Sequence, residues 1–259
     1  MPRLAANLSM LFTELPFMER FEAAARAGFE AVEYLFPYDF DVRELAAALR
    51  RNGLRQVLHN LPAGNWNAGE RGIACHPDRV AEFREGVGRA IDYALALDCP
   101  QLNCLAGIPP ADLAQGRAQA ALVENLRFAA QRLQEAGLGL LIEPVNTFDI
   151  PGFFVNRTDQ AIALINETGS DNLKLQYDIY HAQRMEGELG ATLSKHIARI
   201  GHIQLADNPG RGEPGTGEIN YAWLFGHIDT IGYEGWIGCE YKPRATTAEG
   251  LNWRQTLLG

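Results

Sequence analysis

LGLLIEPVN, residues 138–146, and NLKLQYDIYH, residues 172–181, are two short runs rich in apolar residues. Between them lies DQAIALINET, residues 159–168, a longer amphipathic segment that Gly169 ends. The unit therefore predicts a strand, a helix and a second strand. Strands this apolar along their whole length are typical of a parallel sheet that is buried on both faces.

The same alternation extends over the whole chain. Short apolar runs predict strands at 4–11, 29–36, 54–62, 101–107, 138–146, 172–181, 200–207 and 235–241. Longer segments predict helices at 16–27, 41–52, 77–97, 111–136, 159–168, 190–199, 221–231 and 248–256, with Gly or Pro between the units. Eight such units favour a closed barrel over an open doubly wound sheet. We therefore expect an α/β protein with a single (β/α)8 barrel domain over residues 1–259.

Composition narrows the classes of function. The net charge of -9 disfavours general binding to nucleic acid, whose backbone is also negative. The four cysteines form no CxxC pair, which favours free thiols in a reducing compartment. The chain has no apolar run of membrane-spanning length, and its start lacks the pattern of a secretion signal. We expect a cytoplasmic protein that does not bind membranes.

Four consecutive predicted strands end in polar side chains of the same parity: Glu143, Asp178, Gln204 and Glu240. Alternate residues of a strand share a face, so these four groups should converge at one rim of the barrel. Three of them are carboxylates, and burying three like charges together is costly unless a cation or a proton joins them. A hard divalent cation with oxygen ligands satisfies this requirement.

Each of these residues also has a structural explanation when it is taken alone. Asp178 is suitably placed to cap a helix, and Gln204 could bond to the backbone. For His202 we expect a buried, hydrogen-bonded side chain, and for Glu33 a structural role. The repetition over four consecutive strands favours a functional site.

Several segments resemble one family. They are ANLSMLF (6–12), FPYD (36–39), HNLPAGNWNAGERGIA (59–74), IEPVN (142–146), QYDIYHAQRMEGEL (176–189), ADNPGRGEPGTGEIN (206–220) and GCEYKP (238–243). Together they are similar to the hydroxypyruvate isomerases, within the sugar isomerase and endonuclease IV-like barrel superfamily. The long loop after the third strand is the most specific of these motifs.

The resemblance implies that Glu143 and Glu240 are the acid/base pair, and that both, with Asp178 and Gln204, surround a divalent metal. Related ketose epimerases usually have His where this chain has Gln204. A neutral amide oxygen makes the site harder, so we expect Mg²⁺ or Mn²⁺, with a weakly bound or dispensable metal as the alternative.

The expected reaction interconverts hydroxypyruvate and tartronate semialdehyde through an enediolate, with proton transfer by the two carboxylates. The substrate is a small anionic sugar acid, so its carboxylate needs a local cation. Candidates are Arg71 in the long loop, Arg211 and Lys242, while His59 and His181 are candidates to bind its hydroxyl groups. The long loop is a candidate lid over the site.

Three other enzyme functions and one non-enzymatic role remain open. A 2-oxo-tetronate isomerase would use the same chemistry on a four-carbon acid. Gln204 and the long loop disfavour a ketose 3-epimerase. Only six His and an acidic surface disfavour an endonuclease, and the complete acid/base pair disfavours a barrel that only binds sugars. A homo-oligomer is expected from the resemblance.

Overall fold

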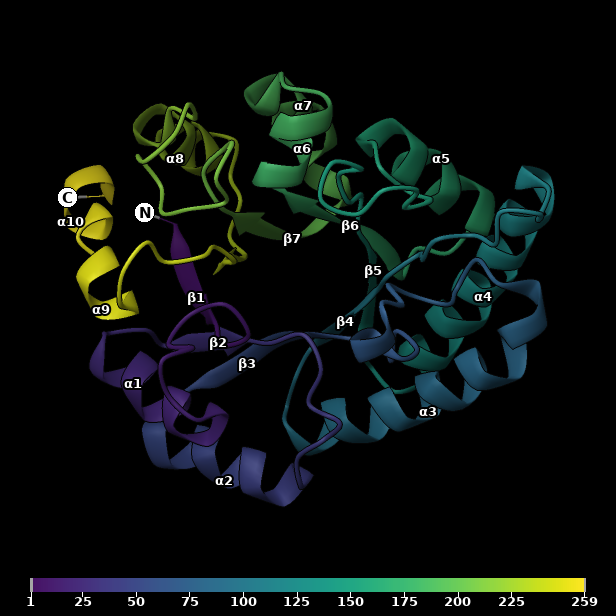
Figure 1. Ribbon diagram of the computed structural model, residues 1–259, viewed down its shortest axis with the longest axis horizontal. Helices are drawn as coiled ribbons and strands as arrows, with labels where there is room; N and C mark the ends of the chain where they lie inside the picture. Colours follow the sequence, from purple (N-terminus) through teal and green to yellow (C-terminus); the bar gives the residue numbers. More distant parts are fainter. Residues whose placement is uncertain (1, 259) are drawn as a thin grey trace.

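Eight strands follow one another around a ring in chain order, and β1 closes the ring against β8. The computed structural model describes residues 2–258. All neighbouring strands are parallel, and Figure 1 shows the helices placed around the outside of the ring. The strands are β1 (Arg3–Asn7), β2 (Ala31–Glu33), β3 (Arg55–Asn60), β4 (Gln101–Cys104), β5 (Gly139–Ile142), β6 (Leu173–Asp178), β7 (Ile200–Leu205) and β8 (Trp236–Cys239). The predicted (β/α)8 barrel is confirmed.

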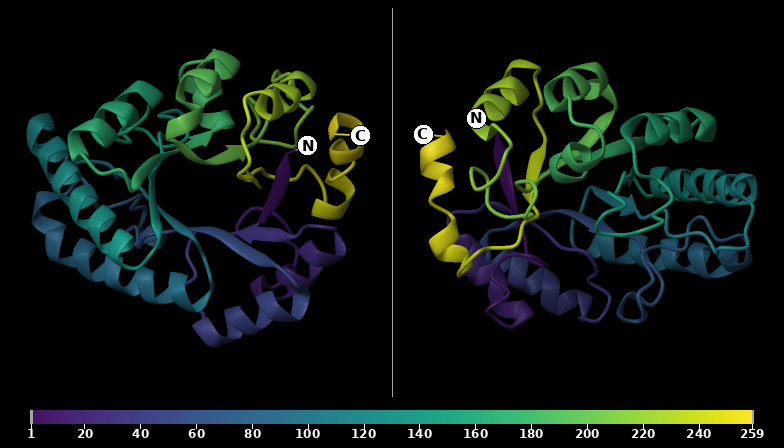
Figure 2. Two further views of the ribbon diagram at one scale, coloured as in Figure 1. Left: turned by 180° about the vertical axis from the view of Figure 1, so that it is seen from behind. Right: turned by 45° about the horizontal axis from the view of Figure 1, so that its top comes forward.

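The helices lie between successive strands, and the view from behind in Figure 2 shows the same ring. They are α1 (Arg20–Arg26), α2 (Val42–Asn52), α3 (Val80–Ala96), α4 (Gln115–Glu135), α5 (Thr158–Thr168), α6 (Ile179–Met185), α7 (Leu189–His196), α8 (Tyr221–Thr230), α9 (Thr247–Gly250) and α10 (Trp253–Leu258). Short 3-10 turns occur at Phe17–Glu19, Trp66–Ala68, Pro77–Arg79 and Ile197–Arg199. Asp41 caps the start of α2 and Gly53, in the left-handed conformation, ends it.

Two helical regions differ from the predicted pattern. The sixth strand ends at Asp178, and α6 begins in what the apolar run 172–181 predicted to be strand. The cause is the Asp178 side chain, which accepts hydrogen bonds from Tyr180 N and His181 N and so starts a helix. At the other end, the helix predicted at 248–256 is two short helices, α9 and α10.

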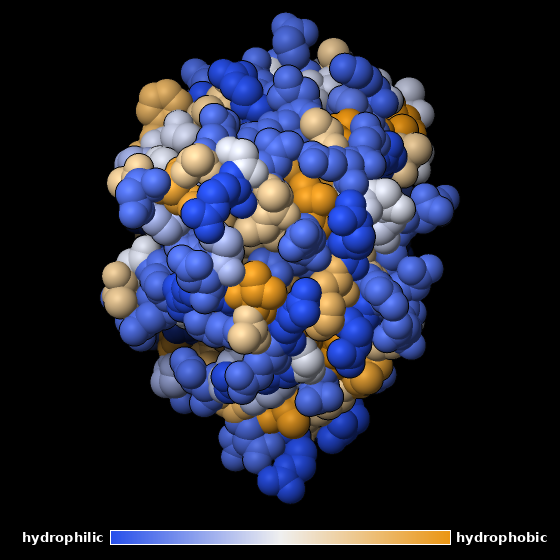
Figure 3. Space-filling model, turned by 90° about the vertical axis from the view of Figure 1, so that its right-hand side faces the viewer, coloured by the Kyte–Doolittle hydropathy of each residue, from blue (hydrophilic) through white to orange (hydrophobic). Residues whose placement is uncertain are grey.

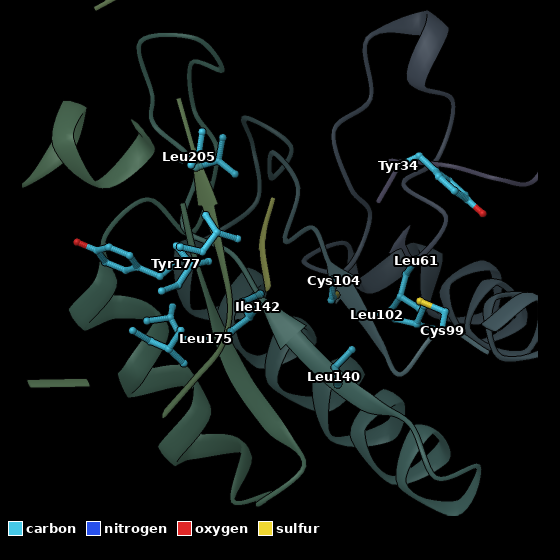
Figure 4. Close-up of a cluster of buried hydrophobic side chains, with 14 of the residues drawn as sticks. Tyr34, Leu61, Cys99, Leu102, Cys104, Leu140, Ile142, Leu175, Tyr177 and Leu205 are labelled. Atoms are coloured by element: carbon cyan, nitrogen blue, oxygen red, sulfur yellow. The ribbon is translucent and has the colours of Figure 1, made fainter. Parts of the chain in front are cut away.

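The apolar core has two parts. The larger part fills the space between the strands and the surrounding helices, and Figure 4 shows members of it from several strands, among them Leu140, Ile142, Leu175 and Tyr177. The smaller part lies inside the barrel and consists of Ala5, Ala31, Val57, Leu58 and Leu141. Two of these residues, Ala5 and Ala31, are small and leave room for the polar side chains described below.

The surface is mixed in character. On the side that carries α4, Figure 3 shows mostly hydrophilic residues with apolar residues in separate small patches. Within residues 2–258, none of the helices combines the length and the apolar character needed to cross a membrane.

Candidate active site

The four polar residues predicted at the strand ends are all buried at one rim of the barrel. Asp178 and Gln204 pair directly across β6 and β7. Glu143 and Glu240 each follow the last residue of a strand, β5 and β8 respectively. Their exposed fractions are only 5% each, so both carboxyl groups are largely removed from water.

Arg211 and His181 connect the three carboxylates. The Arg211 guanidinium lies 2.7 Å from Glu240 Oε2 and 3.8 Å from Asp178 Oδ2. His181 Nε2 lies 3.5 Å from Asp178 Oδ2 and 3.9 Å from Glu143 Oε1. The two glutamates therefore face one shared space, which is bridged in this structure by one cationic and one imidazole group.

The loop after β7 positions Arg211. Its anchor is the buried Asp207, whose carboxylate accepts hydrogen bonds from the backbone N–H groups of Asn208, Gly215, Gly217 and Ile219. Arg211 itself adopts a φ of 54°, and its carbonyl accepts a hydrogen bond from Lys242 N at 2.8 Å. A left-handed conformation at a residue other than Gly is costly, so the loop holds this side chain in a constrained place.

Asp178 has the capping role that the sequence left open, and its place among metal ligands stays a prediction. Its Oδ1 caps α6 by accepting from Tyr180 N at 2.7 Å and from His181 N at 3.3 Å. Its Oδ2 is buried and has no hydrogen-bond partner among residues 2–258. Buried acceptors are normally satisfied, so this oxygen is a candidate to contact a ligand group.

A polar network crosses the inside of the barrel next to the site. Gln204 Nε2 donates to Glu33 Oε1 at 2.7 Å, and His202 Nε2 lies 2.6 Å from Glu33 Oε2. Because β2 and β7 are not neighbours in the ring, these side chains can meet only in its interior. A Cβ at Gly238 would overlap the Glu33 carboxylate, so this position requires glycine. Glu33 and His202 have the structural roles expected of them.

Gln204 uses both ends of its amide within this network. Its Oε1 accepts from Gln176 Nε2 at 2.7 Å, while its Nε2 is bound to Glu33. A carboxylate can only accept, so Glu33 fixes the orientation of the amide. The place of Gln204 among metal ligands stays a prediction.

Two asparagines that the sequence analysis did not select hold the two glutamates. Asn103, on β4, donates from Nδ2 to Glu143 Oε2 at 2.8 Å. Asn7, on β1, donates from Nδ2 to Glu240 Oε1 at 3.3 Å and to Glu33 Oε1 at 2.9 Å. The sequence contained a sign of both residues. Each is a polar residue in a largely apolar strand, at a position whose side chain points into the barrel.

Burial is the largest cause of the pKa shifts of Glu143, Glu240 and His181. Burial, followed by the charges of Glu240 and Asp178, raises the pKa of the Glu143 carboxyl well above its ordinary value. Burial also raises the pKa of Glu240 to about 8, although the nearby Arg211 guanidinium acts in the opposite direction. Burial lowers the pKa of His181 to about 4, so its imidazole is neutral at pH 7. Raised carboxyl pKa values are typical of groups that transfer protons near neutral pH.

His59 lies away from this site. The next residue of β3, Asn60, accepts a hydrogen bond at 3.2 Å from Asn103, which also donates to Glu143, so Asn60 faces inward and His59 lies on the opposite, outer face of the strand. Its Nδ1 lies 2.9 Å from Gln56 Nε2, its ring meets that of Tyr38 edge-on, and burial lowers its pKa to about 3. The predicted contact of His59 with substrate therefore has no support in the structure.

Arg71 and Lys242 are also not joined to the carboxylates. Arg71 stacks over the Trp66 ring at 4.2 Å and donates to Trp66 O and Glu70 O, all within its own loop. Lys242 has an exposed side chain. Of the three predicted cations, the structure places Arg211 beside the buried carboxylates of Glu240 and Asp178.

The long loop after β3 is tied down at several points. Glu70 forms an ion pair with Arg79, and the Phe36 and Trp66 rings lie 5.0 Å apart. Gly72 adopts a φ of 118° and packs so closely on the backbone of the β4 loop that a Cβ would overlap Leu105 O. The loop thus has a defined conformation near the rim of the barrel.

The site contains a group of side chains that could hold a metal ion. Ligand atoms of Glu143, Asp178 and His181 all lie within 4.8 Å of one another, and all three residues are buried. A hollow of about 790 Å³ lies elsewhere, at the amino end of β1 and β8, where Arg3 and Trp236 line it. The converging carboxylates, rather than the size of a hollow, identify the site.

The chain is similar to known proteins over nearly its whole length. Residues 21–257 match a family model described as a xylose isomerase-like TIM barrel. The chain is 58% identical over 253 residues to a hydroxypyruvate isomerase of Escherichia coli, covering 98% of both chains. It is 51% identical over 259 residues to a 2-oxo-tetronate isomerase of Cupriavidus necator, covering 100% of both. A solved structure described as an AP endonuclease, family 2, from Brucella melitensis superposes with a TM-score of 0.96 at 46% identity, covering 99% of both chains.

Proposed function

Because the chain belongs to the hydroxypyruvate isomerase family, we propose that it interconverts hydroxypyruvate and tartronate semialdehyde. The observation that carries this proposal is the convergence of Glu143 and Glu240 on one buried space, linked through Asp178, Arg211 and His181. Two carboxyl groups with raised pKa values provide the acid and the base that this isomerisation requires.

The reaction moves hydrogen without changing the composition of the substrate. One glutamate removes a proton from the hydroxymethyl carbon of hydroxypyruvate, which gives an enediolate. The other glutamate returns a proton to the former carbonyl carbon, and the hydroxyl hydrogen moves to the former carbonyl oxygen. Asn103 and Asn7 hold the carboxylates in place during these transfers.

Arg211 is proposed to bind the carboxylate of the substrate. Its guanidinium is only 18% exposed and already faces the acid/base space. A planar guanidinium suits bidentate recognition of a carboxylate. His181, whose Nε2 lies 3.5 Å from Asp178 Oδ2, is proposed to donate to a substrate oxygen.

The residues present fit a divalent metal. The carboxylates of Glu143, Asp178 and Glu240 are hard oxygen donors, and Asp178 Oδ2 has no hydrogen-bond partner within the described chain. Mg²⁺ or Mn²⁺ bound there would polarise the carbonyl group and stabilise negative charge on the substrate oxygens. Gln204 is the fourth proposed ligand.

A direct assay tests the substrate. The purified protein is incubated with hydroxypyruvate and, in parallel, with 2-oxo-tetronate, and the products are followed by NMR in D2O with and without a chelator. We expect a higher kcat/KM for hydroxypyruvate, and a higher value for the four-carbon acid would assign the alternative function. No affinity for abasic DNA is expected, given the net charge of -9. The cytoplasmic location and a homo-oligomeric state stay predictions.

A further inference from the structure

The side-chain amide of Asn146, in the loop after β5, has a fixed orientation. Its Oδ1 accepts hydrogen bonds from Phe148 N at 3.0 Å and from Asp149 N at 2.8 Å. Backbone N–H groups can only donate, so the atom that they contact must be the amide oxygen. The amide nitrogen, Nδ2, therefore points to the other side.

On that side Nδ2 meets two groups. One is Asp149 Oδ2 at 3.1 Å, and the other is His181 Nδ1 at 2.6 Å. An amide NH2 group can only donate, so His181 Nδ1 accepts and carries no hydrogen. The backbone N–H of Asn146 points at the same ring nitrogen from 3.4 Å, which gives the same assignment.

An imidazole without a hydrogen on Nδ1 carries its single hydrogen on Nε2. This Nε2 is the atom that faces the site, 3.5 Å from Asp178 Oδ2 and 3.9 Å from Glu143 Oε1. We infer that Asn146 is a positioning residue that holds His181 as the Nε2–H tautomer, so that His181 donates a hydrogen bond into the site. The Nε2 lone pair is then not available to a metal, and the metal ligands come from the proposed oxygen donors.

The role of this donor in catalysis rests on the proposed function. During isomerisation the carbonyl oxygen of the substrate gains negative charge, and a fixed N–H donor stabilises it more in the transition state than in the ground state. A neutral imidazole serves this purpose without adding a second full positive charge beside Arg211. Asn146 acts on the reaction only through the hydrogen position on His181.

The test measures the hydrogen position directly. Protein labelled with ¹⁵N in its histidine rings is examined by NMR, and His181 is assigned from its absence in His181→Gln. Four proteins are compared: the unmodified chain, Asn146→Asp, Asp149→Asn and the double variant. At position 146 a carboxylate can only accept, so it should place a hydrogen on Nδ1 of His181. Asp149→Asn is the matched control, because the two backbone N–H groups still orient Asn146.

The inference predicts an unprotonated Nδ1 in the unmodified chain and in Asp149→Asn, and a protonated Nδ1 in both variants that carry Asp at 146. The double variant avoids the repulsion between two adjacent carboxylates, so it gives the result if Asn146→Asp alone does not fold. A hydrogen on Nδ1 in the unmodified chain would overturn the inference. An unchanged ring pattern in the double variant would overturn it as well.

Activity separates this inference from the proposed function. With hydroxypyruvate, the double variant should lose about tenfold or more in kcat while KM changes little, and Asp149→Asn should keep most of its kcat. If the unmodified chain turns over none of the acids but shows the Nε2–H pattern, the proposed function fails and the tautomer assignment stands. If it is active with a hydrogen on Nδ1, only the assignment fails.

Discussion

Arg211 Nη2 lies 2.7 Å from Glu240 Oε2, so the loop after β7 provides the counterion of a carboxylate that follows β8. In the same position the guanidinium also faces the space in which an anionic substrate would bind. Burial lowers the pKa of Arg211, but the charges of Glu240, Asp178 and Glu143 outweigh it and raise that pKa above its ordinary value. Arg211 therefore keeps its positive charge throughout the physiological range.

Arg211→Lys tests the proposed contact with the substrate carboxylate. Lysine keeps the charge but loses the planar fork, so KM for hydroxypyruvate should rise about tenfold or more, with a smaller change in kcat. Steady-state kinetics give both values. Arg26→Lys is the control, because Arg26 is exposed and pairs only with Glu22 in an i,i+4 contact that the structure shows. An unchanged KM in Arg211→Lys would remove this contact from the proposal.

Glu143→Gln and Glu240→Gln should each reduce isomerisation by about 10²-fold to 10⁴-fold, because the shape is kept and the proton-transferring group is lost. Deuterium exchange in D2O assigns the two roles. The variant that keeps the base should still exchange the hydroxymethyl hydrogen of hydroxypyruvate, while the variant that lacks it should not. Circular dichroism checks that both variants are folded. Near-normal turnover in either variant would exclude that glutamate from the mechanism.

Asn103→Ala tests whether Asn103 positions Glu143. Its Nδ2 donates to Glu143 Oε2 at 2.8 Å, so its loss should lower kcat by about 10-fold to 100-fold and leave KM nearly unchanged. Asn125→Ala is a matched control: Asn125 is fully buried on α4 and donates to Ala74 O. The control should lower the melting temperature without a comparable loss of kcat. Equal effects on kcat would mean that Asn103 acts only through stability.

The sequence predicted the barrel because each unit repeats a local pattern. Asp41 and Gly53, for example, start and end α2 as their residue types require. Glu143, Asp178, Gln204 and Glu240 could be placed at one rim, because strand parity and the barrel fold determine it.

Contacts between side chains could not be predicted in the same way. Asn103 meets Glu143, and Glu33 meets His202, only after the ring closes, and neither pair is close in sequence. The direction of the His59 side chain was hard to predict, because parity within β3 depends on a register irregularity between β2 and β3, where Glu33 pairs with Leu58. Arg211 stood in a Gly-rich loop, and only its fold around Asp207 separates it from a surface cation such as Lys242.

The raised pKa of Glu240 predicts that the free energy of unfolding, measured in the presence of a chelator, depends on pH. The ordinary value is 4.5 and the folded value is about 8, so between them the folded chain binds more protons than the unfolded chain. Its free energy of unfolding should therefore fall as pH rises through this window, by on the order of 1 kcal/mol per pH unit. Glu240→Gln removes this contribution. Urea unfolding gives the free energy of unfolding of both proteins at pH 5 and at pH 8. From pH 5 to pH 8 that of the unmodified chain should fall relative to that of Glu240→Gln. The same difference between the two proteins at both pH values would contradict the prediction.

Asp178→Asn separates the capping role of Asp178 from its proposed role in binding metal. Asparagine keeps an acceptor for Tyr180 N and His181 N, so α6 should remain capped, while the charge on the second oxygen is lost. In the unmodified chain, Mn²⁺ at a hundredfold excess over Kd should stabilise the fold by about 2.7 kcal/mol, and Asp178→Asn should lose most of this gain. Thermal unfolding with and without Mn²⁺ measures it. Asp41→Asn is the matched control, since Asp41 caps α2 at an exposed site and should leave the Mn²⁺ effect intact. If Mn²⁺ stabilises Asp178→Asn as strongly as the unmodified chain, Asp178 is not a ligand. If Mn²⁺ stabilises neither protein, the metal is dispensable for the fold of this site.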